Sequence, residues 1–488
     1  MINFSRNLGL AIAVAGFGAS IATAQSPNTA ASLDGRWDAT LVSQGSTIAF
    51  RLDISGSGPT LKGTFYNGFT PYDGTTAASF QDGNLTLNID HYLSKISATL
   101  KDGKLDGNLS STGRGGGSHY EFHATKHVDS NESAANVPNI GGSWDVPLPK
   151  ASSKGEKAYH LVVEQRGAEV AASILRVDGD TGAYTGTYKD GKWVLSHFDG
   201  SRPGNIELTP QADGTLEVLQ GSRRAGVATA SDADGTQPAR VRRGASANAG
   251  ANAYAAPQAV ATTSAVADAE APVAADSRYT PALVAYRDEV AIAKGLPLPE
   301  NYETHTTPRS ASEKLTFTLP DDNGKLVSND DPRFKNKVVL AIVTGTWCPN
   351  CHDEAQYLVQ LDKKYRDKGL AIVALDFEEQ AQQAGLERER AFVKQYGVNY
   401  TYLIAGDPAE MWEKVPQLVN LNTWPATIFV GRDGTIKSVH SGFASPASGK
   451  YNDQLKAEFE SKIQQLLAER PAPDVSTAAP VVTDKPGE

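Results

Sequence analysis

A run of six apolar residues, 338–343, leads directly toward the only two cysteines of this 488-residue chain. These are Cys348 and Cys351, separated by Pro349 and Asn350. An uninterrupted apolar run is typical of a strand that is buried on both faces of a sheet. A proline directly after the first cysteine fits the first turn of a helix. The segment therefore predicts a central strand, a tight turn, and a helix that begins near Cys348 and continues to about residue 367.

The same alternation of strands and helices continues to the C-terminal end of this region. Asn323-Gly324 and Asp433-Gly434 are typical of hairpin turns, and each lies between two short apolar segments. The expected strands are residues 317–319, 325–328, 370–376, 426–430 and 435–441, and the expected helices are 386–396, 409–415 and 453–467. Strand, helix, strand, helix, hairpin and helix is a thioredoxin-like order, so the predicted class of this region is α/β.

Two thiols at this spacing can close a disulfide across one helical turn and open it again. The unpaired amides at a helix N-terminus carry roughly half a positive charge, which favours the thiolate form of Cys348. Cys351 lies one turn inside the helix and is expected to be more buried. We therefore expect Cys348 to attack a substrate disulfide and Cys351 to resolve the mixed disulfide that results.

Two further positions are candidates for this site. Glu354 shares a helix face with Cys351 and apolar side chains, so a raised pKa and proton exchange with the Cys351 thiol are expected. A solvated carboxylate that interacts with the helix dipole is the alternative for Glu354. Trp424-Pro425 precedes a predicted buried strand, and a cis bond there would place the turn, with a backbone able to pair with substrate, against the two cysteines. An ordinary trans proline that opens the strand is the alternative.

The N-terminal half of the chain has strand patterns separated by turn signals, which predicts two all-β domains of barrel or sandwich type at residues 33–127 and 138–243. Turns are expected at Asp73-Gly74, Asp82-Gly83 and Asp102-Gly103. The segment 33–38 is similar to the segment 140–145, and both contain Gly-x-Trp-Asp. A tandem repeat of one β-domain is therefore expected, with chance recurrence of a strand start as the alternative.

Other segments predict how the chain is organised. Residues 1–24 have a positive start, a short apolar stretch and Ala-Thr-Ala, which indicates a cleaved signal peptide, with an uncleaved anchor as the alternative. Residues 244–276 are rich in Ala, Thr and Ser and predict a flexible linker, and 471–488 predict a disordered tail. The α/β domain is expected at 277–470, opened by a helix between Thr280 and Gly295. The net charge of −10 gives no indication of nucleic-acid binding.

Alternatives to redox chemistry remain open at the cysteines. Half of a zinc site is one, although no His-x-x-x-His pair completes it. Cys348, Cys351 and His352 also match the attachment motif Cys-x-x-Cys-His of c-type haem, for which Met411 could be an axial ligand. A scaffold or adhesion protein with a vestigial redox domain is the alternative from another functional class.

Residues from about 317 to 467 resemble the thioredoxin superfamily, and within it the exported thiol–disulfide reductases of the TlpA/ResA type. The resemblance rests on residues 345–351, Glu354, the segment 424–430 and Asp433-Gly434. It implies that Cys348 attacks, that Cys351 resolves, that Glu354 tunes the thiols and that Pro425 is cis. Ile342 stands where cytoplasmic thioredoxins have a buried Asp, which leaves Glu354 as the candidate proton handler.

One departure from the family pattern and one related alternative bear on the substrate. Trp424 is bulkier than the usual residue before that proline and could narrow or redirect the substrate groove. A peroxiredoxin-like Pro-x-x-x-Thr-x-x-Cys arrangement is not matched, because Ala341 and Gly345 stand at those positions. Direct peroxide reduction is therefore not expected.

The predicted function is that of an exported, periplasmic thiol–disulfide oxidoreductase without a bound cofactor or metal, whose redox centre is the Cys348–Cys351 pair. Its expected partners are proteins that contain disulfides and an upstream thiol reductant, with no nucleic acid and no membrane span after signal cleavage. Trp347, Pro349, Trp424 and Pro425 are the expected substrate-binding residues. The β-domains are expected to form a binding module.

Overall fold

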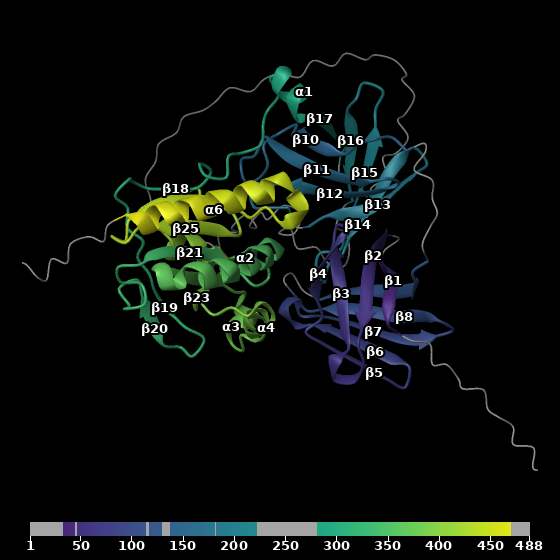
Figure 1. Ribbon diagram of the computed structural model, residues 1–488, viewed down its shortest axis with the longest axis horizontal. Coiled ribbons are helices and arrows are strands. Elements are labelled where there is room, and N and C mark those ends of the chain that lie inside the picture. The colour runs from purple at the N-terminus through teal and green to yellow at the C-terminus, as the bar shows by residue number, and fades with distance from the viewer. Residues whose placement is uncertain are drawn as a thin grey trace, which may run out of the picture. The chain divides into compact units, whose positions relative to one another are not determined.

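The computed structural model describes residues 33–43, 46–113, 117–128, 137–180, 182–221 and 281–469 (Figure 1). The predicted signal peptide, linker and tail lie outside these residues. All described residues from Asp34 onward belong to one compact unit. Among the helices described, none combines the length and the apolar character that crossing a membrane requires.

The first β-domain is an antiparallel sheet of nine strands in which neighbours in sequence are mostly neighbours in the sheet. Asp82-Gly83 and Asp102-Gly103 form the predicted turns, and all four residues have positive φ, as type I′ hairpin turns require. Asp73-Gly74 does not form the predicted turn, because both residues lie in a strand, where Gly74 pairs with Thr64 next to an irregularity in the register. The elements are β1 (Gly35–Ser43), β2 (Ser46–Ser55), η1 (Gly58–Thr60), β3 (Lys62–Asn67), β4 (Thr70–Gly74), β5 (Ala77–Gln81), β6 (Asn84–Ile89), η2 (Asp90–Tyr92), β7 (Ser94–Lys101), β8 (Lys104–Ser111) and β9 (Ser118–Lys126).

The second β-domain is a closed antiparallel barrel. Its core contains Trp144 and Trp193 together with inward-facing aliphatic side chains. The barrel strands are β10 (Gly142–Pro147), β11 (Ala158–Arg166), β12 (Glu169–Leu175), β13 (Tyr184–Lys189), β14 (Lys192–His197), β15 (Gly204–Pro210), β16 (Leu216–Gln220) and β17 (Leu283–Arg287).

The last barrel strand corrects a prediction. The residues between Thr280 and Gly295 were expected to form one helix, but β17 pairs with β10 and β16, and only α1 (Asp288–Ala293) is helical. The apolar residues Leu283 and Ala285 pack in the barrel core, and this burial decides the local structure. The second β-domain therefore extends past the predicted boundary at 243.

The two β-domains share more than the Gly-x-Trp-Asp motif. In each, the first strand pairs with both the second and the last strand, and its tryptophan stands at equivalent positions in these pairings. Trp37 stacks with Lys126 of the last strand, with the ammonium 4.5 Å from the ring centroid, and Trp144 stacks with Arg287 of the last strand at 3.8 Å. The two β-domains share this arrangement of their first and last strands, but the second is a closed barrel and the first is a nine-stranded sheet.

The C-terminal domain has a five-stranded sheet in the order β23-β22-β21-β25-β26, with β21–β22 and β22–β23 parallel and the other pairs antiparallel. Along the chain, the predicted succession of strands and helices is present, and the sheet contains one strand that was not predicted, the edge strand β23. The elements are β18 (Thr307–Pro308), β19 (Thr318–Pro320), β20 (Leu326–Ser328), β21 (Val338–Thr344), α2 (Pro349–Tyr365), η4 (Arg366–Lys368), β22 (Leu370–Phe377), α3 (Gln380–Gln383), α4 (Glu387–Tyr396), β23 (Thr401–Gly406), η5 (Pro408–Glu410), α5 (Met411–Lys414), β24 (Leu418–Val419), β25 (Ala426–Val430), β26 (Ile436–Ser441), η6 (Pro446–Ser448) and α6 (Lys450–Ala468).

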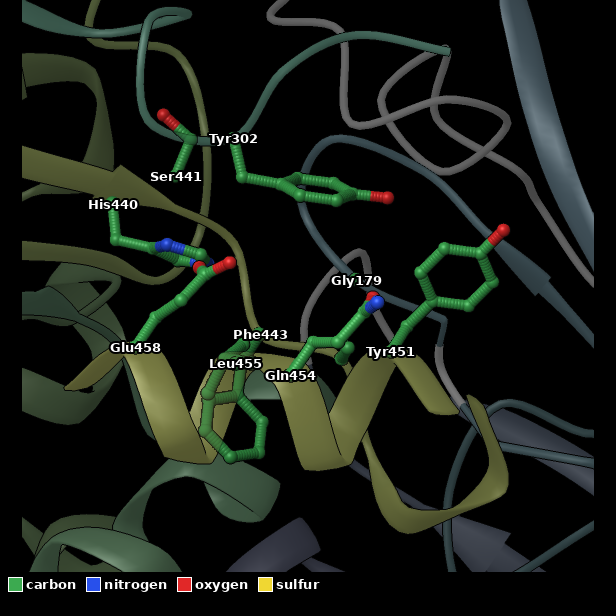
Figure 2. Close-up of a pocket in the computed structure, with 10 residues that line it drawn as sticks. Gly179, Tyr302, His440, Ser441, Phe443, Tyr451, Gln454, Leu455 and Glu458 are labelled. Carbon is green, nitrogen blue, oxygen red and sulfur yellow. The ribbon is translucent and has the colours of Figure 1, made fainter. Parts of the chain in front are cut away.

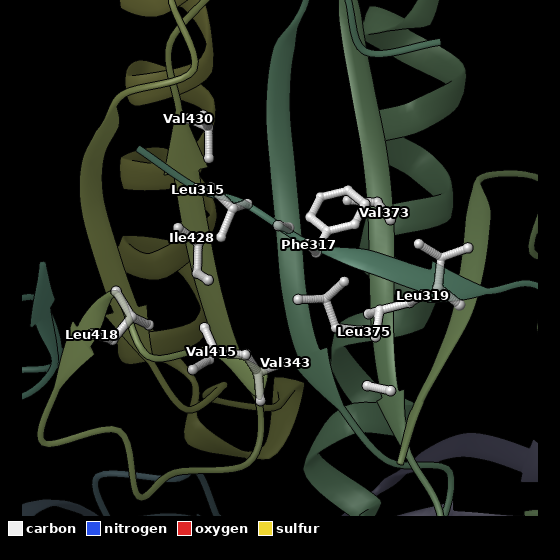
Figure 3. Close-up of a cluster of buried hydrophobic side chains, with 14 of the residues drawn as sticks. Leu315, Phe317, Leu319, Val343, Val373, Leu375, Val415, Leu418, Ile428 and Val430 are labelled. Atoms are coloured by element: carbon white, nitrogen blue, oxygen red, sulfur yellow. The ribbon is translucent and has the colours of Figure 1, made fainter. Parts of the chain in front are cut away.

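The central strand β21 is apolar throughout because both of its faces are covered. Val339, Ala341 and Val343 pack in one cluster with side chains from β19, β22 and β25, part of which Figure 3 shows. Leu340 and Ile342 pack on the opposite face, against α2 and α6. The strand thus points its C-terminal end, and the turn that follows it, at the start of α2.

Candidate active site

The two cysteines occupy the turn and the first helical residues that follow β21. Cys348 is the N-cap of α2 and Pro349 is its first residue, as the sequence predicts. Both cysteines are free thiols, with exposed fractions of 3% for Cys348 and 2% for Cys351. The greater burial that was expected for Cys351 is therefore not observed, because Cys348 is covered equally well.

The pKa values of the two thiols shift in opposite directions. Burial raises the pKa of Cys348, but the thiol of Cys351, the charge of Arg202 and the amide of Cys351 outweigh it, and the net pKa lies below the ordinary value. Burial and the hydrogen bond with Cys348 hold the pKa of Cys351 well above the ordinary value. The two thiols therefore differ in how readily each forms a thiolate, with Cys348 the more acidic of the pair.

The Trp424–Pro425 turn lies against the cysteines. The peptide bond is cis, and the Cys348 thiol donates a hydrogen bond to the carbonyl oxygen of Trp424 at 3.5 Å. The Trp424 ring packs edge-on against Trp347, with ring centroids 5.1 Å apart, and Trp347 donates from Nε1 to the carbonyl oxygen of Phe377 at 2.8 Å. The two tryptophans thus flank the sulfur atoms on the side of the cis proline.

Glu354 is buried beside the cysteine pair, with an exposed fraction of 1%. It accepts a hydrogen bond from the Thr427 hydroxyl through Oε1, and its Oε2 has no hydrogen-bond partner. Burial raises the pKa of Glu354 to about 8, with a further increase from Cys348. A solvated carboxylate, the alternative considered from the sequence, does not describe this position.

A buried ionic network holds the turn before Cys348 in place. Glu378 accepts hydrogen bonds from the amide of Thr346 at 2.8 Å and from the Thr346 hydroxyl. Arg388 forms ion pairs with Glu378 and Glu379, and its Nε donates to the Thr346 hydroxyl oxygen at 3.0 Å. The charged loop and helix that follow β22 are therefore tied to the residues that position the first thiol.

His352 is fully buried, and both of its ring nitrogens have partners. Nδ1 lies 2.8 Å from the Tyr396 hydroxyl, and Nε2 lies 2.6 Å from the carbonyl oxygen of Thr346. Burial also holds the His352 pKa well below the ordinary value, so the ring is neutral. Met411 is packed in the core cluster on the other face of the sheet. This arrangement does not fit the haem alternative, because His352 has no nitrogen left for iron and Met411 is buried elsewhere.

The β-domains contact α2 directly beside the cysteines. Tyr72 of β4 donates a hydrogen bond to Asp353 at 2.6 Å, and Tyr92 of η2 stacks on His352 with ring centroids 4.1 Å apart. From the barrel, the carbonyl oxygen of Asp178 accepts from Asn350 at 2.6 Å. No sequence pattern indicates these contacts or the influence of Arg202 on Cys348. Thr427, the hydrogen-bond partner of Glu354, lies in the segment 424–430, which the sequence already singles out.

Comparison with known proteins gives the same assignment for the C-terminal domain. The Redoxin family matches residues 310–455. The thiol-disulfide oxidoreductase ResA of Bacillus cereus (strain ATCC 10987 / NRS 248) is 30% identical over 156 residues, which are 32% of this chain and 76% of that protein. The chain belongs to the ResA family of thiol–disulfide oxidoreductases.

Two other similarities cover the same region. The thioredoxin-like protein YneN of Bacillus subtilis (strain 168) is 30% identical over 128 residues, which are 26% of this chain and 68% of that protein. The crystal structure of a putative thiol:disulfide interchange protein DsbE from Chlorobium tepidum has a TM-score of 0.26 and 23% identity, covering 32% of this chain and 98% of that chain. In this ResA family member the β-domains are additions outside the region that the Redoxin family matches.

Proposed function

We propose that this enzyme reduces protein disulfides in an exported compartment, with Cys348 as the attacking and Cys351 as the resolving thiol. The single observation that carries the proposal is the placement of two free thiols at the first turn of α2, with the Cys348 thiol against the carbonyl oxygen that precedes the cis proline. A thiolate attacks and a thiol does not, and the lowered pKa of Cys348 beside the raised pKa of Cys351 supports this order.

The exchange proceeds in two steps that balance in atoms and electrons. The Cys348 thiolate attacks one sulfur of a substrate disulfide, that bond breaks, and the other substrate sulfur leaves as a thiolate that is protonated by water. Cys351 then loses its proton and attacks the Cys348 sulfur, which releases the second substrate thiol. The substrate gains two electrons, the chain retains a Cys348–Cys351 disulfide, and an upstream thiol protein reduces it again.

Glu354 is the group that takes the proton from Cys351 in this proposal. It lies three residues after Cys351 in the same helix and is buried with one carboxylate oxygen free of hydrogen bonds. A pKa of about 8 makes it a base of suitable strength near neutral pH.

The cis turn supplies the surface for the substrate backbone. The carbonyl oxygen of Trp424 lies next to the Cys348 sulfur, so an extended substrate segment that pairs with this backbone would bring its disulfide to the thiol. Trp347, Pro349, Trp424 and Pro425 are proposed to form this surface. The β-domains are proposed to act as a module that controls which proteins reach it.

The proposal is tested by reduction of insulin disulfides with a thiol reductant present. Cys348→Ser is expected to lose this activity, and Cys351→Ala is expected to accumulate a mixed disulfide with the substrate. A redox titration of the Cys348–Cys351 couple gives the direction of the physiological reaction. Unchanged biological function in Cys348→Ser would instead favour the scaffold alternative. Detection of the mature chain with a new N-terminus at Gln25 in a periplasmic fraction tests the proposed export.

A further inference from the structure

Neither sulfur atom can meet a protein disulfide in the arrangement that the structure describes. Disulfide exchange requires the attacking sulfur to reach the substrate sulfur directly. Cys348 and Cys351 are both almost completely buried, at 3% and 2% exposure. What covers the first thiol therefore decides when the enzyme can act.

One segment that packs beside the Cys-x-x-Cys turn is the barrel loop of residues 177–180, between β12 and β13. The carbonyl oxygen of Asp178 accepts hydrogen bonds from Asn350 Nδ2 at 2.6 Å and from the amide of Phe443 at 3.4 Å. Gly179 forms a parallel β-bridge with Phe443, and the two residues line the same pocket beside α6 (Figure 2). The loop therefore lies against the C-terminal domain in an extended, strand-like pairing.

This pairing is adjacent to the surface proposed for the substrate. The amide of Gly442, the residue before Phe443, donates to the carbonyl oxygen of Pro425 at 2.8 Å. Asn350 lies between the two cysteines in sequence. The loop thus contacts both the Cys-x-x-Cys segment, through Asn350, and the segment after β26, where Gly442 bonds to the cis proline.

The contact depends on glycine on both sides. A Cβ on Gly179 would lie 2.3 Å from the carbonyl oxygen of Phe443, and a Cβ on Gly442 would lie 2.3 Å from the carbonyl oxygen of Val177. Both glycines also have positive φ. At Gly179 and Gly442 the backbones of the loop and of the C-terminal domain lie so close together that no residue with a Cβ fits.

Asp180 fixes the end of the loop. Its carboxylate is buried and accepts from the amide of Ser445 at 2.9 Å and from the hydroxyl of Ser448, both in the C-terminal domain. It also accepts from the amide of Gly182 within its own domain, at 2.8 Å. Moving the Asp180 carboxylate out of this site costs free energy unless water replaces it as the acceptor for the Ser445 amide and the Ser448 hydroxyl.

We propose that the 177–180 loop is a built-in lid of the redox site, and that disulfide exchange with protein substrates requires Asp180 to leave Ser445 and Ser448. The role of the lid in disulfide exchange rests on the proposed function, whereas the closure of the loop over Cys348 can be tested without it. The closed arrangement protects the thiols from unselected disulfides and oxidants, and a partner that displaces the barrel loop gains access to Cys348.

The test is the rate at which iodoacetamide alkylates Cys348 in the reduced full-length chain, with the modified peptide identified by mass spectrometry. Rates are compared on the alkaline plateau of the pH–rate profile, where differences in thiolate fraction no longer contribute. Asp180→Ala and Ser448→Ala are each expected to increase this rate about tenfold or more, since either removes a contact that holds the lid closed.

Asp213→Ala is the matched control. Asp213 resembles Asp180 in accepting a hydrogen bond from the amide two residues further on, that of Thr215 at 3.0 Å. It also accepts from the Thr215 hydroxyl at 2.7 Å, and both bonds lie within one barrel turn. Its alkylation rate is expected to equal that of the unmodified chain. Equal rates in all four proteins would overturn the lid, even if insulin reduction proceeds. Faster alkylation of both lid variants without any insulin reduction would keep the lid and reject the proposed function.

Discussion

Thr427 of β25 donates a hydrogen bond to the Glu354 carboxyl of α2, two residues after the cis proline. The contact joins the helix that carries both cysteines to the strand that begins at the proposed substrate surface. It also leaves Glu354 with a single hydrogen-bonded oxygen in a buried site, which accounts for the direction of its pKa shift.

Glu354→Gln is expected to change the pH dependence of disulfide reduction. Burial raises the Glu354 pKa to about 8, so the group gains its function as a base as the pH rises through that value. Wild-type turnover should therefore increase with an inflection near pH 8 that the variant lacks, and turnover of the variant at pH 8 should fall at least several-fold. Steady-state insulin reduction across the pH range measures both effects. An unchanged inflection in the variant would remove Glu354 from the proton transfer.

The same substitution is expected to increase the stability of the folded chain at alkaline pH, although it lowers activity. Because the folded pKa of Glu354 lies above that of the unfolded chain, ionisation disfavours the folded state as the pH rises from about 4.5 to 8. Glu354→Gln removes this penalty, so its stability relative to the wild type should improve by as much as a few kcal/mol between pH 5 and pH 8. Thermal unfolding at the two pH values measures the difference. Thr427→Val serves as a comparison that removes the hydrogen bond but retains the acid.

Arg202→Gln is expected to raise the pKa of Cys348. The charge of Arg202 lowers that pKa, although the residue belongs to the barrel and lies far from the cysteine in sequence. The ultraviolet absorbance of the thiolate, followed against pH in the reduced chain, measures the shift. Arg166→Gln removes an equal charge from an exposed arginine of the same domain and should leave the titration unchanged. Equal titrations of the two variants would contradict a specific influence of Arg202.

The sequence predicts the elements whose burial pattern is local and misses the contacts between distant segments. The apolar run 338–343 and the hairpin at Asp82-Gly83 define their structures within a few residues, and both predictions are confirmed. Strand β17 was missed because Thr280, Pro281 and Gly295 are typical helix boundaries, whereas its strand partners lie before the long segment 222–280. Its identity depends on tertiary pairing that local sequence does not encode.

Some features of the candidate site can likewise be predicted from local sequence, whereas others depend on contacts between domains. The positions of Cys348, Glu354 and Pro425 follow from the motif and from helical periodicity. The lid does not, because Asp178-Gly179-Asp180 is ordinary turn sequence and nothing local indicates what packs on it. Burial of the first thiol is therefore a property of the assembled domains.

Asp73→Ala is expected to loosen the contact between the first β-domain and α4. Burial opposes ionisation of Asp73, but hydrogen bonds from His91, Gly74 and Gln395 outweigh it, and the pKa falls to about 2. Because the pKa of Asp73 is lower in the folded chain than in the unfolded chain, its ionised form stabilises the fold at pH values above the unfolded pKa. This stabilisation is lost as the pH falls from about 4 to 2. The variant should lose roughly 2 kcal/mol or more at pH 7.

Hydrogen exchange measures this loss locally, which avoids assuming that a multidomain chain unfolds in one step. Amides of η2 and α4 should exchange faster in Asp73→Ala, while those of β25 should not change. Asp90→Ala is the control, because Asp90 belongs to the same η2 segment but is exposed and accepts a hydrogen bond from the Thr76 hydroxyl of its own domain. Equal protection of η2 in the two variants would show that Asp73 is not what holds this contact.

Arg388→Met is expected to destabilise the C-terminal domain and to disturb the cysteine turn together. Arg388 is fully buried between Glu378 and Glu379, and removing it leaves both carboxylates without their cation. Breaking a buried ion pair from one side costs about 3–5 kcal/mol. Because Glu378 also holds the amide of Thr346, two residues before Cys348, the displaced carboxylate should shift the thiol as well. Arg390→Met, on the exposed face of the same helix, should change the midpoint of denaturation little. If Arg388→Met lowered stability but left the Cys348 titration identical to that of Arg390→Met, the network would support the fold without positioning the thiol.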